Sequence, residues 1–171
     1  ISLKKVKCKM KVLFIGGSGN ISTSVSRMAI ERGNELTLLN RGKTKANIPG
    51  ARWLSADFHD LGQTQNVLAN ESFDVVVDWI AYTREDIERD LSLFSGKCGQ
   101  FVFISSASAY QKPPSNVIIR ESTPLHNPFW QYSRNKIACE ELLLQAYREQ
   151  GFPITIVRPS HTLSLIHISE P

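Results

Sequence analysis

Short apolar runs alternate along this chain with longer segments in which apolar residues recur every three or four positions. The short runs are rich in β-branched and aromatic residues, and they predict strands at 11–15, 35–40, 51–55, 73–80, 100–105 and 153–158. The periodic segments predict helices at 20–32, 60–70, 84–94 and 129–150. Polar stretches that contain glycine or proline predict loops at 41–50 and around 113–116.

The regular alternation of strands and helices predicts the fold class. It indicates an α/β protein with a doubly wound parallel sheet of the Rossmann-like kind. The nearly continuous apolar runs at 73–80 and 100–105 are typical of strands covered by helices on both faces of the sheet. In such sheets ligands bind at the carboxyl ends of the strands, so the residues at those ends are the candidates for chemistry.

The two ends of the chain look foreign to this domain. Four lysines lie within residues 1–9, and without that leader the chain has 16 basic and 16 acidic residues. The net charge of +4 therefore belongs to the leader, and we expect no nucleic acid partner. Residues 163–171 are interpreted as a translated sequencing adapter, although a genuine strand is the alternative. These boundaries leave residues 10–162 as the domain.

Composition removes several classes of protein. Hydrophobic residues make up 42% of the chain, which is too many for a disordered protein, and no run of about 18 apolar residues predicts a membrane span. The three cysteines are far apart and the four histidines lack metal-ligand spacing, so we expect neither disulfides nor a metal site. Free cysteines favour a reducing compartment, and the predicted location is cytoplasmic.

A glycine-rich turn follows the first predicted strand and opens the first helix. Gly16 permits the tight turn, and Gly19 lets the backbone approach a pyrophosphate at the start of the helix, where we expect Asn20 and Ile21 to contribute. The third glycine of the dinucleotide-binding pattern is replaced by Ser22. An ordinary turn seldom has three glycines in four residues, so we predict a dinucleotide phosphate site.

The end of the second strand bears on the choice of cofactor. NAD enzymes usually have an acidic residue there for the ribose 2′-hydroxyl, whereas this chain has Asn40 and Arg41. Arg41 could pair with a 2′-phosphate, so the expected cofactor is NAD or NADP with a slight preference for NADP; a solvated basic loop is the alternative. Asp57 could meet an adenine edge or cap a helix.

Tyr132 and Lys136 form the second candidate site. They are four residues apart in a predicted helix and share one face. A lysine ammonium near a phenol favours the phenolate, which turns a poor base into a usable one. A serine at the end of the fifth strand could polarise a substrate carbonyl from the same edge of the sheet. Alone, the pair would be read as an ordinary surface pair.

With these motifs in place, the chain resembles the short-chain dehydrogenase/reductase superfamily in its extended NAD-dependent epimerase/dehydratase branch. The resemblance lies in the segments GGSGNIS (16–22), FVFISSASAY (101–110), ESTPL (121–125), YSRNKIACEELL (132–143) and IVRPS (156–160). It implies that Ser106, Tyr132 and Lys136 are catalytic, with Tyr110 marking the serine. It also implies cofactor contacts from Lys136 and from Ala81 at the end of the fourth strand.

Further properties are implied by the resemblance alone. Arg158 would lie near the nicotinamide end of the site. The substrate would be a small molecule, possibly a nucleotide sugar, and the chain would stop before the C-terminal substrate lobe and form a homodimer. The accessory asparagine of the family has no counterpart, because residues 72–114 contain no asparagine.

Two functions remain in competition. The first is an NAD(P)-dependent epimerase, dehydratase or reductase that uses Ser106, Tyr132 and Lys136. The second is a non-catalytic dinucleotide-binding regulatory or RNA-associated protein, because a fold does not determine a function. The enzyme interpretation requires that the three side chains lie together beside a turn whose backbone amides are free.

Overall fold

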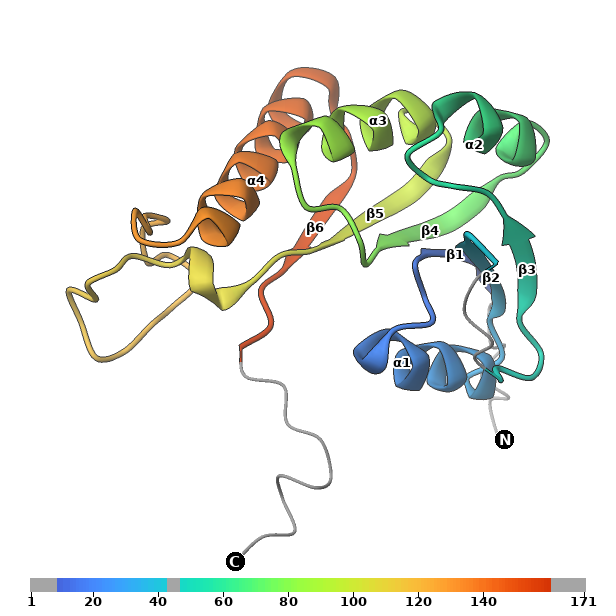
Figure 1. The fold of residues 1–171 in the computed structure, drawn as a ribbon, viewed down its shortest axis with the longest axis horizontal. Coiled ribbons are helices and arrows are strands. Elements are labelled where there is room, and N and C mark those ends of the chain that lie inside the picture. Colours follow the sequence, from blue (N-terminus) through green and yellow to red (C-terminus); the bar gives the residue numbers. More distant parts are fainter. Residues whose placement is uncertain (1–8, 43–46, 161–171) are drawn as a thin grey trace, which may run out of the picture.

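In the computed structural model, which describes residues 9–42 and 47–160, six parallel strands form one sheet (Figure 1). The strands are β1 (Lys11–Ile15), β2 (Glu35–Asn40), β3 (Arg52–Ser55), β4 (Phe73–Asp78), β5 (Cys98–Ile104) and β6 (Ile154–Val157). Their order across the sheet is β3-β2-β1-β4-β5-β6, the doubly wound order. The predicted fold class is confirmed.

The order reverses between β1 and β4, which lie side by side in the middle of the sheet. Ile15 at the end of β1 pairs with Asp78 at the end of β4. The chain leaves these two strands toward opposite faces, because α1 and α3 cover different sides (Figure 1). A crevice at the carboxyl ends of neighbouring strands is where doubly wound sheets bind ligands.

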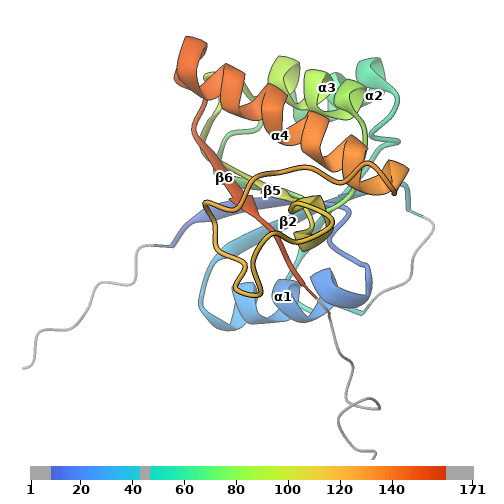
Figure 2. The ribbon, with the colours of Figure 1, turned by 90° about the vertical axis from the view of Figure 1, so that its left-hand side faces the viewer.

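Helices cover the two faces unequally. Figures 1 and 2 show α1 on one face and α2, α3 and α4 together on the other. The bounds of the helices are α1 (Asn20–Glu31), α2 (Leu61–Leu68), α3 (Arg84–Phe94) and α4 (Gln131–Gln150). Alternate residues of β1 serve the two cores: Val12 and Phe14 pack on the α1 side, whereas Leu13 and Ile15 pack on the other.

Element ends follow local chemistry that the sequence displays. Asp60 caps α2 by accepting a hydrogen bond from the Gln63 N–H at 3.0 Å, and Gly151 ends α4 in the left-handed conformation with φ of 68°. Two predicted strand bounds were wrong by two residues, and the bounds at the start of β3, the end of β5 and both ends of β6 by one. β5 starts at Cys98 because it pairs from there with Phe73, and β4 ends at Asp78, where the chain turns.

An irregular segment joins β5 to α4 and extends beyond the edge of the sheet (Figures 1 and 2). It contains one 3₁₀ turn, Ala107–Ala109, and an isolated antiparallel bridge between Tyr110 and Leu125. Within the described ranges, no helix is both long and apolar enough to span a bilayer. The proposed leader, apart from Lys9, and the proposed adapter segment 163–171 lie outside the described residues.

Candidate active site

Gly16 and Gly17 shape the turn after β1. Gly16 has φ of 81°, and a Cβ there would lie 2.2 Å from Cγ2 of Ile80. A Cβ on Gly17 would lie 2.6 Å from Cδ2 of Leu38 and 2.9 Å from Cβ of Phe14. Both contacts are closer than real Cβ atoms come, so this turn can be made only by glycine.

Gly19 lies where the turn meets the start of α1. Its N–H donates to the Ser22 hydroxyl at 2.8 Å, so this amide is already occupied. A Cβ on Gly19 would meet only that hydroxyl, at 3.4 Å, which leaves open space above the turn. The N–H groups of Asn20 and Ile21, in the first turn of α1, have no acceptor among the described residues. These two amides are therefore open to a ligand, and Ser22, which is buried, also caps the turn with its hydroxyl.

A pocket of about 310 Å³ opens beside this turn at the carboxyl ends of β1, β2 and β3. Arg41 and Asp57, predicted to bind the cofactor, both line it, together with His59. Asn40 at the end of β2 is joined to the glycine turn, because its Nδ2 donates a hydrogen bond to the Ser18 hydroxyl at 3.0 Å. The pocket is thus bounded by one cation and one carboxylate from the predicted set.

A second pocket, of about 360 Å³, lies at the opposite end of the strands. Arg52 and Glu71 line it, and they neutralise each other through a hydrogen bond of 2.9 Å. The carboxyl-end pocket is therefore the better candidate, because it adjoins the turn with open backbone amides and its Arg41 forms no ion pair within the described ranges.

Lys136 lies on α4 and is 5% exposed. Its Nζ donates to the carbonyl of Ala81 at 2.7 Å and to that of Ile104 at 2.8 Å, and it lies 4.6 Å from the centre of the Phe103 ring. Burial lowers its pKa, whereas nearby acidic groups oppose that shift. An ammonium has three hydrogens, so one remains for a ligand. Ala81, predicted as a cofactor contact, is placed here as the anchor of the lysine.

Tyr132 lies one helical turn before Lys136, and the structure brings the two together. The Lys136 Nζ is 5.9 Å from the centre of the Tyr132 ring. That ring packs between Tyr82 and Trp130, with centroid distances of 5.5 Å and 4.9 Å. The Tyr132 hydroxyl has no hydrogen-bond partner within the described ranges. The ring is held by its neighbours while the phenol oxygen is left available.

Ser106 lies directly after β5, in the irregular segment. Its Oγ is 2.9 Å from the Ser108 hydroxyl and accepts the Ser108 N–H at 3.1 Å. Ser108 in turn contacts the hydroxyl of Ser133, the residue after Tyr132, at 3.0 Å. Ser106 and Tyr132 themselves share no direct hydrogen bond. The three predicted catalytic residues therefore lie at one edge of the sheet, with Ser106 linked to Ser133 on α4 through the hydroxyl of Ser108.

Arg158 and Tyr110 have structural partners. Arg158 forms an ion pair with the buried Glu140 at 2.6 Å, and it donates to the Tyr110 hydroxyl at 3.1 Å. The hydrogen bonds to Glu140 raise the pKa of Arg158 further above its usual value. Ser105 also donates to Glu140. In the described residues, Arg158 thus joins β6 to α4.

Two buried carboxyls, Asp78 on β4 and Asp90 on α3, were not recognised in the sequence. Asp78 Oδ1 accepts the N–H groups of Ile80 and Ala81 at 2.6 Å and 2.7 Å, which turns the chain after β4. Asp78 Oδ2 and both oxygens of Asp90 face no N–H donor among the described residues. Burial raises the pKa of both groups, and the nearby Asp78 raises that of Asp90 further. Burial and the neighbouring carboxyl thus both favour the protonated form of Asp90.

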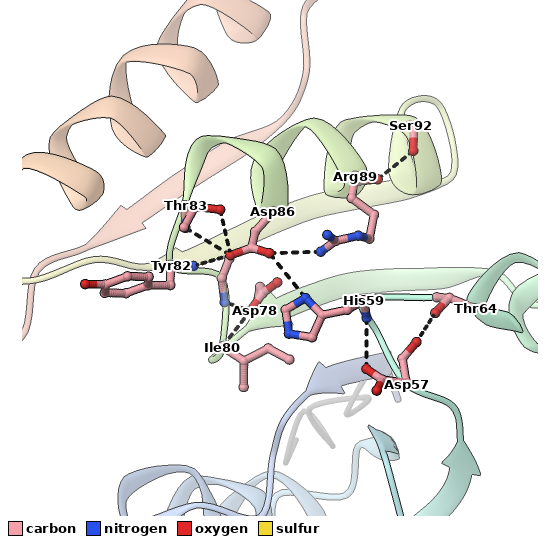
Figure 3. Close-up of polar contacts among 11 residues, drawn as sticks. Asp57, His59, Thr64, Asp78, Ile80, Tyr82, Thr83, Asp86, Arg89 and Ser92 are labelled. Carbon is pink, nitrogen blue, oxygen red and sulfur yellow. Dashed lines mark hydrogen bonds and ion pairs between the residues drawn. The ribbon is translucent and has the colours of Figure 1, made fainter. Parts of the chain in front are cut away.

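Asp86 accepts hydrogen bonds from several groups at the start of α3 (Figure 3). Its Oδ2 accepts the N–H groups of Tyr82 and Thr83, both at 2.9 Å, and its Oδ1 accepts from Arg89 at 3.0 Å and lies 3.6 Å from His59 Nδ1. Burial opposes ionisation here, but these donors outweigh it and lower the pKa of Asp86. This ionised carboxylate fixes the loop that carries Ala81 and Tyr82.

The described part of the chain contains no group of three or more His, Cys, Asp or Glu side chains arranged to hold a metal ion. Cys98 and Cys139 are free thiols in that part, and burial raises the pKa of Cys98 to about 11 and that of Cys139 to about 12. Neither thiol is therefore a nucleophile at neutral pH.

Known proteins resemble this chain over nearly its whole described length. A family model described as the NAD dependent epimerase/dehydratase family matches residues 12–166. A UDP-glucose 4-epimerase of Lactobacillus helveticus is 27% identical over 168 residues, covering 87% of this chain and 51% of that protein. The chloroplast stem-loop binding protein of 41 kDa b of Arabidopsis thaliana is 28% identical over 163 residues, covering 87% and 41%.

Solved structures show the same fold. A dTDP-glucose 4,6-dehydratase of Bacillus anthracis, solved in complex with NAD, superimposes with a TM-score of 0.74 at 17% identity, covering 87% of this chain and 54% of the other. The chain spans about half the length, or less, of the curated relatives that it matches.

Proposed function

The chain belongs to the NAD dependent epimerase/dehydratase family, and we propose that its protein is an NAD(P)-dependent oxidoreductase that acts on a nucleotide sugar or a related hydroxyl or carbonyl compound by reversible hydride transfer. One observation carries this proposal. The Tyr132 ring is fixed by two aromatic neighbours, its hydroxyl is unengaged within the described ranges, and the buried Lys136 ammonium lies 5.9 Å from the ring centre.

The residues present fit a dinucleotide. The free amides of Asn20 and Ile21 point from the start of α1, and the open space above Gly19 lets a diphosphate approach them. The adjoining pocket of about 310 Å³ offers room for an adenosine. When bound, the nicotinamide supplies the acceptor or donor of hydride.

The chain's own groups would handle the proton and the substrate oxygen. Tyr132, as phenolate, takes the proton of a substrate hydroxyl. The Lys136 ammonium lies 5.9 Å from the centre of the Tyr132 ring and keeps one N–H for the cofactor ribose, because its other two are committed to Ala81 and Ile104. Ser106 donates to the oxygen that becomes a carbonyl.

The cofactor is proposed to be NAD or NADP, with a slight preference for NADP. Arg41 lines the pocket and forms no ion pair in the described part of the chain, which supports a 2′-phosphate partner. Asp57 in the same pocket acts against a second negative charge, which limits the preference.

The substrate class rests on relatives. Several similar proteins are named UDP-glucose 4-epimerases, which supports a nucleotide sugar as substrate. A homodimer and a cytoplasmic location belong to the same proposal. The family resemblance supports the homodimer, and the free thiols of Cys98 and Cys139 support a reducing compartment.

A non-catalytic, RNA-associated role is the second candidate. The similarity to the stem-loop binding protein of Arabidopsis favours it. The balance of 16 basic and 16 acidic residues after position 9 acts against it, because RNA binding depends on excess positive charge.

The test is Tyr132→Phe in the full-length protein, assayed with NAD and NADP against UDP-glucose, UDP-galactose and dTDP-glucose. We expect turnover to fall by about 10² to 10⁴-fold, the usual contribution of a positioned acid or base. The unfolding free energy should stay unchanged, because the lost hydroxyl has no hydrogen-bond partner in the part of the chain that the structure describes.

Tyr147→Phe is the matched control, since Tyr147 lies on the same helix and is 56% exposed. It should leave turnover unchanged. Turnover of Tyr132→Phe equal to that of the wild type would remove Tyr132 as the base. Binding of a stem-loop RNA without any turnover would favour the second candidate.

A further inference from the structure

Behind Ser106 lies a connected line of polar side chains to which the proposed reaction assigns no role. It runs from Asn127 through Ser133 and Ser108 to Ser106, over successive distances of 3.2 Å, 3.0 Å and 2.9 Å. Ser133 is fully buried and Asn127 is 7% exposed, so the inner end of the line is shielded from water. Buried polar groups of this kind keep the hydrogen-bond directions that their partners impose.

Asn127 fixes the direction of hydrogen-bond donation at the buried end of this line. Its Oδ1 accepts the N–H of Phe129 at 3.2 Å, and its Nδ2 donates to the carbonyl of Ser108 at 2.8 Å. Rotating the amide by half a turn would place an oxygen against the Ser108 carbonyl and an N–H against the Phe129 N–H, which loses both bonds. Two independent partners therefore fix the amide so that Nδ2 faces the Ser133 hydroxyl.

The fixed amide of Asn127 then determines which hydroxyl donates to which in the rest of the line. Ser133 accepts from Asn127 and donates its single proton to Ser108 Oγ. Ser108 Oγ has accepted a proton, so its own proton is available for Ser106 Oγ at 2.9 Å. Ser106 Oγ also accepts the N–H of Ser108 at 3.1 Å. When Ser108 donates to it, the Ser106 oxygen has two donors directed at it, and its own O–H then points away from the line.

We propose that Asn127, Ser133 and Ser108 are positioning residues that make Ser106 a one-way hydrogen-bond donor toward a substrate oxygen. This inference rests on the proposed function for its substrate, but not for its geometry. A serine held in this way suits an oxygen that gains negative charge, such as the carbonyl oxygen of a ketosugar during reduction. A serine free to rotate would spend part of its time as an acceptor and would stabilise that oxygen less.

Neutron diffraction of the protein crystallised in heavy water tests the direction without any assay of activity. We expect deuterium between Ser133 Oγ and Ser108 Oγ belonging to Ser133, and deuterium between Ser108 Oγ and Ser106 Oγ belonging to Ser108. A deuterium of Ser106 directed at Ser108 Oγ would overturn the proposal, whatever the enzyme does. Absence of turnover with the expected deuterium positions would count against the proposed function alone.

Asn127→Asp tests the consequence, because it is nearly the same size and reverses the inner end. A carboxylate has no proton to give, so Ser133 would donate to it and the hydroxyls would turn around. We expect kcat to fall by about 10²-fold, the usual cost of one donor to a developing oxyanion, while the dissociation constant of the cofactor stays within about twofold.

Asn116→Asp is the matched control on the same irregular segment. Its Oδ1 accepts the Ile118 N–H at 2.9 Å, a role that aspartate also fills, so kcat should not change. Ser133→Ala should lower kcat as Asn127→Asp does, and Ser133→Thr should restore it by returning a hydroxyl. This second pair covers the case in which Asn127→Asp unfolds. Wild-type kcat in a folded Asn127→Asp or Ser133→Ala variant would contradict the proposal.

Discussion

The two halves of the sheet's carboxyl edge differ in how completely their polar groups are paired. Beside β1 and β2, the amides of Asn20 and Ile21 lack acceptors and Arg41 lacks an ion pair within the described ranges. Beside β4 and β5, Lys136 and Ser106 have their hydrogen-bond partners within the chain. The first half has groups left for a ligand, whereas the second holds its groups in fixed directions.

Under the proposed function, this difference separates the half that binds the cofactor from the half that carries out the chemistry. A ligand gains affinity from donors that are open before it arrives, because no internal bond has to be broken. A reacting oxygen gains most from donors that are already oriented, because no reorganisation is needed during the reaction. Substitutions in the two halves should therefore have different signatures, and three predictions use this contrast.

The largest effect should come from Gly16→Val. A Cβ there would lie 2.2 Å from Ile80, and the backbone at this position has a positive φ that valine rarely adopts. We therefore expect the unfolding free energy to fall by about 3–5 kcal/mol. Urea unfolding measures this loss. Gly62→Ala is the control: its nearest neighbour would be 3.6 Å away, and it should stabilise the chain by about 0.5–1 kcal/mol. Equal effects of the two would show that the turn is not strained.

The second effect concerns the Asp78–Asp90 pair. An aspartate with a raised pKa in the folded state keeps a proton that the unfolded chain releases above about pH 4. The free energy of unfolding is therefore highest at low pH and falls as the pH rises toward the raised pKa. We expect Asp90→Asn to remove this fall, which amounts to at most about 1.4 kcal/mol per pH unit for one proton.

Urea unfolding across a series of pH values measures the slope for Asp90→Asn. Glu88→Gln on the same helix is the control and should keep the wild-type slope, because its side chain is 56% exposed. The opposite slope at acid pH belongs to Asp86, whose lowered pKa makes its contribution disappear as pH falls. An unchanged slope in Asp90→Asn would mean that Asp90 is ionised.

The smallest effect should come from Arg41→Ala. An exposed arginine paired with a phosphate contributes about 1 kcal/mol, so the affinity for NADP should fall about fivefold while that for NAD stays the same. Calorimetric titration with each cofactor measures the ratio. Arg148→Ala, in the last turn of α4, should change neither affinity. A loss of affinity for both cofactors would place Arg41 against a part that they share.

The sequence was sufficient for the sheet and for the placement of Tyr132 and Lys136 on one helix face. Alternating apolar runs predicted every described strand, and the four-residue spacing of Tyr132 and Lys136 predicted their shared helix face. The end of β4 could not be located, because the apolar run continues through Trp79 and Ile80, whereas the turn is set by Asp78 accepting two backbone N–H groups. Periodicity carries no information about such a bond.

The polar line behind Ser106 was beyond sequence reasoning for a different reason. Asn127 and Ser108 are 19 residues apart in an irregular segment, and Ser133 lies on a helix that could meet that segment in many ways. The role of Ser22 was partly visible, since a small residue was expected at that position. That its hydroxyl would occupy the Gly19 amide depends on the dihedral angles of the turn, which composition does not determine.

The Ser22 hydroxyl has a thermodynamic consequence. An anion that approaches the Gly19 amide must displace this hydroxyl, so binding there is an exchange of one hydrogen bond for another and yields less enthalpy than contact with an open amide. The same bond keeps the backbone ordered before any ligand arrives, so less conformational entropy is lost on association. The two effects oppose each other in the free energy of binding at the Gly19 amide and shift it from enthalpy toward entropy.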